Sequence, residues 1–89
     1  MNYIAVIHKD PKSDFGVSFP DFPGCITAGR TLEEAKIMAA EALEGHIAEM
    51  RAAGEPIPQP ASLEAVLANP DFADGAAFIV VKVREPAPA

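Results

Sequence analysis

The chain has 89 residues, a formal net charge of −6 and an isoelectric point of about 4.7. Its length suits one domain, and its 49% hydrophobic and 22% charged residues are typical of a globular chain. A domain this small has a marginal core, for which oligomerisation is a common remedy. The acidic balance argues against direct binding to nucleic acid, which needs clustered lysine and arginine. It suits a basic protein partner, although acidity alone more often only makes a protein soluble.

Cys25 is the single cysteine, so the chain cannot form an internal disulfide and nothing points to an oxidising compartment. Zinc sites use closely spaced cysteine and histidine pairs, whereas Cys25, His8 and His46 stand apart, so no metal site is expected. The segment 1–8 lacks a basic start, and its apolar run is too short for a signal peptide or a membrane span. We therefore expect a cytoplasmic protein with no membrane segment.

Three short strands are predicted in the first third of the chain. Tyr3–Ile7 is a nearly continuous apolar run, and Phe15–Phe19 alternates apolar with small or polar residues. The third strand, Cys25–Gly29, follows Pro23 and Gly24, which predict a type II turn because proline presets the first central φ and glycine accepts a positive second one. The two short connections favour an antiparallel meander.

A long helix is predicted from Leu32 to about Ala53. Thr31 and Glu34 form a capping box at its start, and Gly54 supplies its stop. At 100° per residue, one side of the helix is apolar and is expected to lie on the sheet. That side comprises Leu32, Ala35, Ala39, Ala42, Leu43, His46, Ile47, Met50 and Ala53. The opposite side is acidic, with Glu33, Glu34, Glu41 and Glu44.

After the helix, proline occupies every second position of residues 55–60, which predicts an extended connecting arm. Ser62 then caps a short helix, Leu63–Ala68. Ala77–Arg84 reads as the last strand, buried in its apolar first half, and residues 85–89 form a flexible tail.

These elements predict an α+β domain in β-β-β-α-β order, with the short second helix before the last strand. An antiparallel three-stranded meander and a returning C-terminal strand form the sheet, and one long helix covers a face of it. If the last strand lies beside the first, its connection crosses the helix layer, and we expect the two to be parallel.

No catalytic constellation is evident in the chain. Cys25 and His46 could meet only if the helix interior faces the third strand, and they would then be buried without a glycine-rich oxyanion loop. Tyr3–Ile7 carries no carboxylate, so two-metal nuclease chemistry has no ligands there. Phosphate-binding glycine motifs are absent as well. We therefore expect a binding module that uses no cofactor.

Val17–Cys25 followed by Gly29–Ala35 resembles the HicB family of antitoxins from prokaryotic toxin–antitoxin pairs. The specific signal is Phe-Pro-Asp-x-Pro-Gly-Cys joined to Thr-Leu-Glu-Glu-Ala at this spacing. Further matching features are Tyr3, the polar loop 10–14, Glu41-Ala42-Leu43, Gly54 and the proline-spaced segment 56–62. The likeness covers about residues 1–84.

This resemblance implies a partial RNase H-like fold without RNase H catalysis. It also implies that the protein binds and masks a small basic mRNA interferase toxin of the HicA type, and that it forms a homodimer or homotetramer. Position 30 is arginine where the family often has an acidic residue. Family members usually continue into a DNA-binding module, but this sequence ends five residues after Arg84. We therefore expect a HicB-like domain over residues 1–84, no C-terminal DNA-binding domain and no operator binding.

The surface pattern suggests where such a partner would bind. The acidic helix side and two loop carboxylates would attract a basic protein, and two apolar residues would anchor it. The candidate interface residues are Asp14, Asp21, Phe22, Glu33, Glu34, Ile37, Glu41 and Glu44. Phe22 is also a candidate to pin the Pro20-Asp21 corner to the core. The alternative hypothesis is an oligomeric scaffold or ligand-binding domain without a toxin partner.

Overall fold

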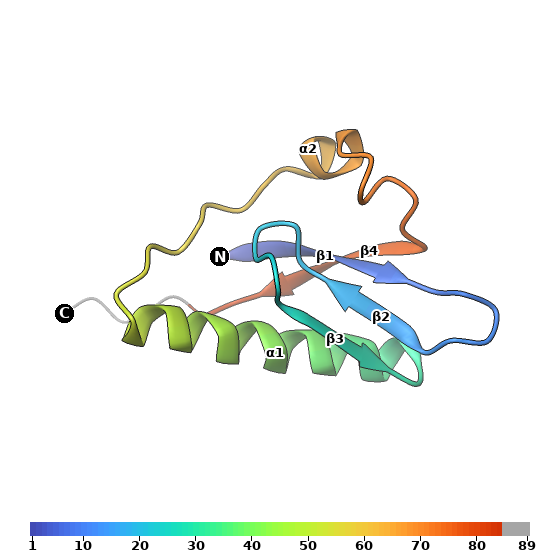
Figure 1. Cartoon of the computed structure of the whole chain (residues 1–89), viewed down its shortest axis with the longest axis horizontal. Coiled ribbons are helices and arrows are strands. Elements are labelled where there is room, and N and C mark those ends of the chain that lie inside the picture. Colours follow the sequence, from blue (N-terminus) through green and yellow to red (C-terminus); the bar gives the residue numbers. More distant parts are fainter. Residues whose placement is uncertain (85–89) are drawn as a thin grey trace.

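The computed structural model describes residues 1–84, which form one four-stranded sheet with a helix on each face (Figure 1). The predicted tail 85–89 lies outside the described residues. The elements are β1 (Asn2–His8), β2 (Phe15–Ser18), β3 (Ile26–Gly29), α1 (Leu32–Ala52), α2 (Leu63–Ala68) and β4 (Ala77–Lys82). The strand order is β3-β2-β1-β4, which confirms the α+β meander with a returning last strand.

The expected parallel pairing of the last strand is wrong. β4 runs antiparallel to β1, in a register that pairs Asn2 with Lys82 and Ile7 with Ala77. The reason is the path of the connection. In Figure 1 the arm and α2 carry the chain from the end of α1 back along the length of the sheet, so β4 starts beside the end of β1.

The main core lies between the sheet and α1. Alternate β1 residues enter it, because successive side chains of a strand point to opposite faces. From β1 these are Tyr3, Ala5 and Ile7, and from α1 they are Ala35, Ala39, Leu43 and Ile47. The alanines let the helix lie close to the sheet. Leu32 was expected to face inward but is 43% exposed, since it is the first residue of the helix.

Local turn and cap chemistry fixes the connection from β2 to α1. Gly24 has φ of +89°, and the Cys25 N–H donates to the Phe22 carbonyl over 3.0 Å, which confirms the type II turn. The Thr31 hydroxyl accepts from the Glu34 N–H over 3.0 Å, as predicted for the start of the helix. Gly29 sits so close to α1 that a Cβ there would lie 2.4 Å from the Ala35 nitrogen. This position therefore requires glycine.

Two long-range hydrogen bonds hold the proline arm. The Tyr3 hydroxyl donates to the Pro58 carbonyl over 2.6 Å, and the Asp21 carboxylate accepts from the Ala61 N–H over 3.1 Å. The Tyr3 ring also meets the Phe22 ring edge to face at 4.8 Å. The first strand and the Pro-Asp corner thus fix a segment that lies 40 to 55 residues later in the sequence.

The second face of the sheet is covered more sparsely. Val66 of α2 is buried, and Gly75 lies against the Val6 side chain. The apolar start of β4 was expected to be buried, yet Val80 is 68% exposed. It lies on an edge strand under a helix of only six residues, which is too short to cover it.

We predict that alkaline pH destabilises the protein through Tyr3. Burial and the nearby Asp21 carboxylate raise the pKa of Tyr3 above its ordinary value of 10.0, while Arg51 opposes the shift. When a group has a higher pKa in the folded state than in the unfolded state, its protonated form stabilises the fold. This stabilisation is fully present at a pH below the unfolded-state pKa, and it is lost as the pH rises through the folded-state pKa. The unfolding free energy should therefore fall above about pH 10.

Tyr3 is the only tyrosine and there is no tryptophan, so phenolate absorbance reports this one group. Its titration midpoint should lie above that of a free tyrosine, and Tyr3→Phe should remove this part of the pH dependence. A midpoint at or below the free value would contradict the prediction.

Candidate functional site

The exposed side of α1 is strongly acidic. The helix carries five glutamates and two basic residues, Lys36 and Arg51. Glu33, Glu41 and Glu44 are exposed, as the helical periodicity predicts. Ile37 lies one turn from Glu33 and one turn from Glu41 and is 61% exposed, so an apolar side chain stands within this acidic row.

A shallow cleft of about 300 Å³ lies between the start of β3 and the middle of α1. It is lined by Gly24, Cys25, Ile26, Glu41, Ala42, Gly45, His46 and Glu49. Glu41 and Glu49 are exposed glutamates on the helix side, and Ile26 is 73% exposed on the strand side. The cleft therefore combines negative charge with an accessible apolar side chain.

Gly45 is the one glycine of α1 and lies at the surface of this cleft. Glycine in a helix interior costs about 1 kcal/mol relative to alanine. A Cβ at Gly45 would meet nothing within 4 Å, so packing within the chain does not require glycine here. What the glycine does provide is bare helix backbone at the cleft surface, where another molecule can approach closely.

Three of the sequence-predicted site residues have partners within the fold. Glu34 accepts a hydrogen bond from the Arg30 N–H over 3.0 Å, and Asp21 accepts from Ala61 of the arm. Phe22 was predicted as an apolar surface contact, and this is wrong. It is 2% exposed and fills the core between Tyr3 and His46, so only its predicted role of pinning the corner is confirmed.

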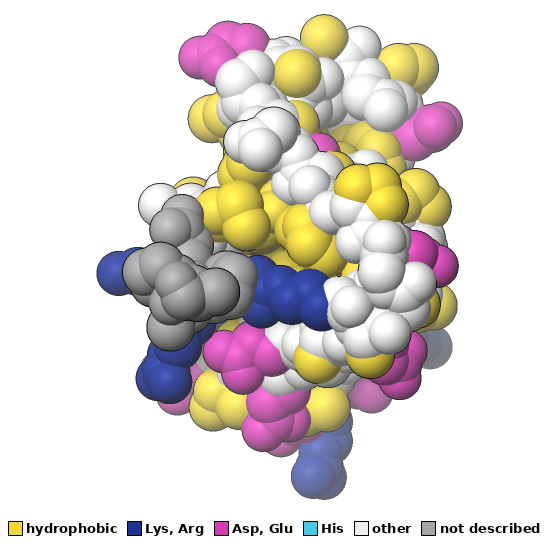
Figure 2. All heavy atoms as spheres, turned by 90° about the vertical axis from the view of Figure 1, so that its left-hand side faces the viewer, with side chains coloured by type: hydrophobic (Ala, Val, Ile, Leu, Met, Phe, Trp, Pro, Cys, Tyr) yellow, Lys and Arg dark blue, Asp and Glu magenta, His cyan; other side chains and the backbone are white. Residues whose placement is uncertain are grey.

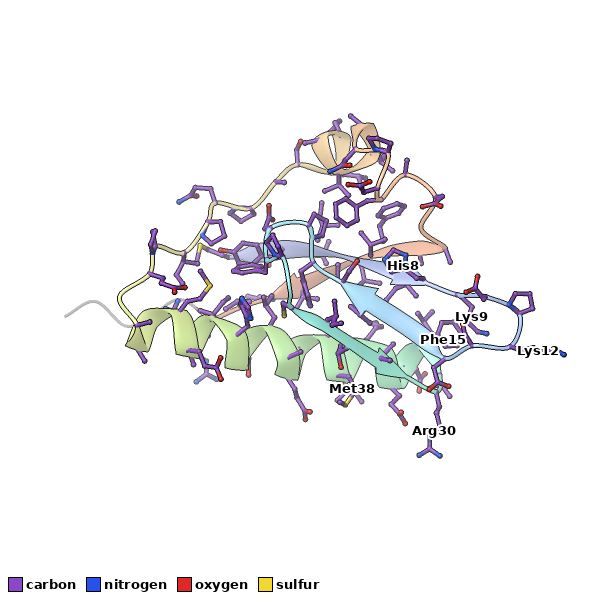
Figure 3. The ribbon with its side chains drawn as sticks, in the orientation of Figure 1. His8, Lys9, Lys12, Phe15, Arg30 and Met38 are labelled. Atoms are coloured by element: carbon purple, nitrogen blue, oxygen red, sulfur yellow. The ribbon has the colours of Figure 1, made fainter. Side chains whose placement is uncertain are left out.

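Asp14 lies apart from the acidic cleft. It belongs to the loop between β1 and β2, which also carries Lys9 and Lys12. Figure 3 shows both lysines at this end of the molecule, with Lys9 beside Phe15 and with Arg30 at the same end. The Lys9 ammonium is 5.3 Å from the centre of the Phe15 ring. Asp14 therefore shares its loop with two lysines and does not belong to the row of glutamates with which it was grouped.

The structure brings Cys25 and His46 to the same cleft, but not as a catalytic pair. Burial raises the pKa of the Cys25 thiol, whereas a catalytic cysteine needs a lowered one. The His46 ring packs edge to face on the Phe22 ring, with 5.7 Å between the ring centres. The arrangement is that of packed side chains.

Within residues 1–84, no three histidine, cysteine, aspartate or glutamate side chains are placed to hold a metal ion together. In the same residues, neither helix has the length and apolar character needed to cross a membrane.

Sequence reasoning missed three residues of the cleft: Ile26, Gly45 and Glu49. Glu41, Gly45 and Glu49 are spaced four residues apart and so share one side of the helix. The available signal was an isolated glycine inside a helical pattern, with a glutamate four residues before it and another four residues after it. The exposure of Ile26 had no such signal, because it depends on the position of β3 at the edge of the sheet.

The fold and the site define a class: a small α+β binding domain whose exposed helix presents an acidic, shallow surface. Comparison with known families is more specific. The model of the HicB-like antitoxins of bacterial toxin–antitoxin systems matches residues 3–86. The chain belongs to this family.

Similar proteins and solved structures agree with this family assignment. A 14.9 kDa protein of Haemophilus phage HP1 is 42% identical over 67 residues. The match covers 75% of this chain and 48% of the phage protein, so the chain spans about half the length of that relative. The N-terminal domain of Burkholderia pseudomallei antitoxin HicB is similar with a TM-score of 0.79 and 28% identity. That likeness covers 96% of this chain and all of the domain.

A chain of a complex between HicA3 and HicB3, a toxin and its antitoxin, is similar with a TM-score of 0.76 and 28% identity. The likeness covers 96% of this chain and all of that chain. The antiparallel sheet with one long and one short helix is thus the architecture of HicB N-terminal domains.

We predict that Gly45→Ala stabilises the isolated protein by about 1 kcal/mol, because it removes the helix cost of glycine and its methyl group meets open space. Gly29→Ala is the matched control. Its Cβ would collide with the α1 backbone, so we expect a loss of about 1–3 kcal/mol. Urea unfolding of both variants measures the two changes. Destabilisation by Gly45→Ala would show that the glycine serves the fold.

Proposed function

We propose that this chain is an antitoxin that binds a small basic toxin of the HicA type and masks it. The observation that carries the proposal is the family match over residues 3–86, joined to the similarity with a chain of the HicA3–HicB3 complex. A net charge of −6 and an acidic α1 suit a basic partner.

The cleft between β3 and α1 is the proposed binding surface. Its shallow shape and the bare backbone at Gly45 allow a partner to lie close to the helix. Ile26 and Ile37, 73% and 61% exposed, are the proposed apolar anchors. Glu41 and Glu49 line the cleft with Ile26, and Glu33 and Glu41 lie one helical turn on either side of Ile37. Together with Glu44, these glutamates supply attraction and orientation more than net affinity.

The proposed interface contains fewer residues than the set predicted from the sequence. Asp21 and Glu34 are engaged in holding the arm and capping α1, so we assign them to the fold. Phe22 is excluded by its burial, and Asp14 belongs to the β1–β2 loop, which also carries Lys9 and Lys12.

We further propose that the chain is not itself an enzyme and that it acts in the cytoplasm beside its toxin. Inhibition requires only that the toxin surface be covered. The raised pKa of the Cys25 thiol supports the absence of catalysis, since a protonated thiol is a poor nucleophile. The net negative charge likewise favours contact with the toxin over contact with nucleic acid.

The direct test is titration of the purified chain with the product of the adjacent gene. We expect a stoichiometric complex with a small basic protein, and loss of that protein's ribonuclease activity on binding. The absence of any complex would overturn the proposal and favour a scaffold role without a toxin.

We predict that Glu41→Gln with Glu49→Gln slows association with this toxin by on the order of tenfold at low salt. The dissociation rate should change less, and the difference from wild type should shrink as salt rises. Stopped-flow association at two ionic strengths measures both effects.

Glu55→Gln with Glu64→Gln is the matched control, because it removes the same charge from exposed positions outside α1. It should have a much smaller effect. Equal slowing by the two pairs would show that net charge, and not the cleft, attracts the toxin.

A further inference from the structure

β3 forms an outer edge of the sheet, because it is first in the strand order and pairs with β2 alone among the described strands. Met1 and Val83 exchange hydrogen bonds of 3.0 and 2.8 Å, so they form a hydrogen-bonded pair of the antiparallel ladder. Such pairs alternate, and the registers of β1, β2 and β3 carry the alternation across the sheet. The backbone N–H and C=O groups of Ile26 and Ala28 therefore point away from β2. The Arg30 N–H points the same way and donates to a side chain of α1.

This edge opens on the acidic cleft. Ile26 lines the strand side of the cleft, and Glu41, Gly45 and Glu49 line its helix side. Figure 1 shows β3 running along α1, so a strand added to the outer edge of β3 would also lie along this part of the helix. Ile26 is 73% exposed and Ala28 is exposed as well. An accessible edge with outward backbone groups is a template for pairing with an extended segment of another chain.

The spacing of the helix residues matches the period of a strand. Alternate residues of a strand lie on one face about 7 Å apart, and residues four apart in a helix lie about 6 Å apart along its axis. Three alternate residues of an added strand would therefore meet Glu41, Gly45 and Glu49 in turn. The two glutamates favour cations at the outer positions. The bare backbone at Gly45, where a Cβ would meet nothing within 4 Å, leaves room for a large side chain between them.

The other edge of the sheet does not suit a basic strand. β4 ends at Lys82, Arg84 follows it, and both side chains are exposed. Figure 2 views the end of the molecule where β4 finishes, and lysine and arginine side chains lie there beside hydrophobic ones. Like charges across a strand pair are destabilising, so the cations of this edge would repel a basic segment. The charges of the chain therefore direct such a segment to β3.

We propose that the toxin binds by strand addition, with an extended basic segment of the toxin hydrogen-bonded to Ile26 and Ala28 at the outer edge of β3. Its basic side chains lie on Glu41 and Glu49, and a large side chain between them packs on Gly45. This inference rests on the proposed function and adds the way in which the two proteins meet. It also gives a reason for a glycine in the middle of α1, where packing within the chain requires none.

A proline at the edge tests the backbone pairing. Ala28→Pro removes an outward N–H and leaves the bonds to β2 in place, since edge strands accept proline where the N–H faces outward. We expect the affinity of the full chain for the product of the adjacent gene to fall by about ten- to hundredfold, because a carbonyl of the toxin segment loses its donor. Isothermal titration calorimetry measures the dissociation constant.

Val80→Pro is the matched control, because Val80 is an exposed residue whose N–H points outward from the opposite edge strand. It should leave the affinity unchanged. Equal weakening by the two prolines, or unchanged binding of Ala28→Pro, would refute strand addition to β3. Circular dichroism shows whether each variant keeps the sheet, and Gly45→Leu decides the matter should Ala28→Pro not fold.

Gly45→Leu tests the contact on the helix without altering the sheet. Leucine favours a helix more than glycine does and its side chain meets open space, so the isolated variant should be at least as stable to urea as the wild type. The same side chain fills the space proposed for the toxin, so the affinity should fall by on the order of tenfold or more. Binding as tight as that of the wild type would exclude the proposed contact at Gly45.

Binding of the wild-type chain separates this proposal from the proposed function. A wild-type chain that forms no complex with the product of the adjacent gene overturns the proposed function, and strand addition falls with it. A wild-type complex that neither Ala28→Pro nor Gly45→Leu weakens leaves the antitoxin role standing and overturns strand addition alone.

Discussion

The structure depends on the hydrogen bonds that hold the proline arm against the first strand and the Pro-Asp corner. The Tyr3–Pro58 and Asp21–Ala61 bonds fix the path by which the chain crosses from α1 to the other face of the sheet. Each contributes about 1 kcal/mol net, but losing one would leave a polar group without its partner, which costs more. This path sets where α2 lies and where β4 begins, and the pairing of β4 with β1 from Ala77 to Lys82 then holds the last strand.

Local rules predicted the elements well because their causes are local. Thr31 and Glu34 cap α1, Gly24 permits the type II turn, and Ser62 caps α2, each within a few residues of the feature it fixes. The direction of β4 was wrong for the opposite reason. It depends on the route that the arm takes across the sheet, which the bond between Tyr3 and Pro58, 55 residues apart, helps to hold and which no local pattern encodes. The predicted burial of the first half of β4 was wrong for the same reason, since it depends on how much of the strand α2 covers.

The candidate site residues also divide into those that a local pattern predicted and those that depend on distant contacts. Helical periodicity correctly placed Glu33, Glu41 and Glu44 on the exposed side of α1. It could not show that Phe22 turns inward, because an aromatic residue in a turn can face either way until Tyr3 and His46 enclose it. The residues of the family motif and the residues of the proposed binding surface are thus largely different. The Phe-Pro-Asp corner and the helix cap build the scaffold, and the residues proposed to meet a partner lie on the surface they position.

The sparse cover of the second sheet face has a dynamic consequence. Among the described residues, α2 has one fully buried side chain, Val66, and a six-residue helix has little stability of its own. We therefore expect residues 55–76 to open together at a lower free energy than the sheet and α1, with the arm detaching from Tyr3 as they do so. Proteases would cut this segment first, and amide hydrogens there would exchange first. Degradation of the free protein would begin in this segment, while α1 and the acidic cleft remained folded.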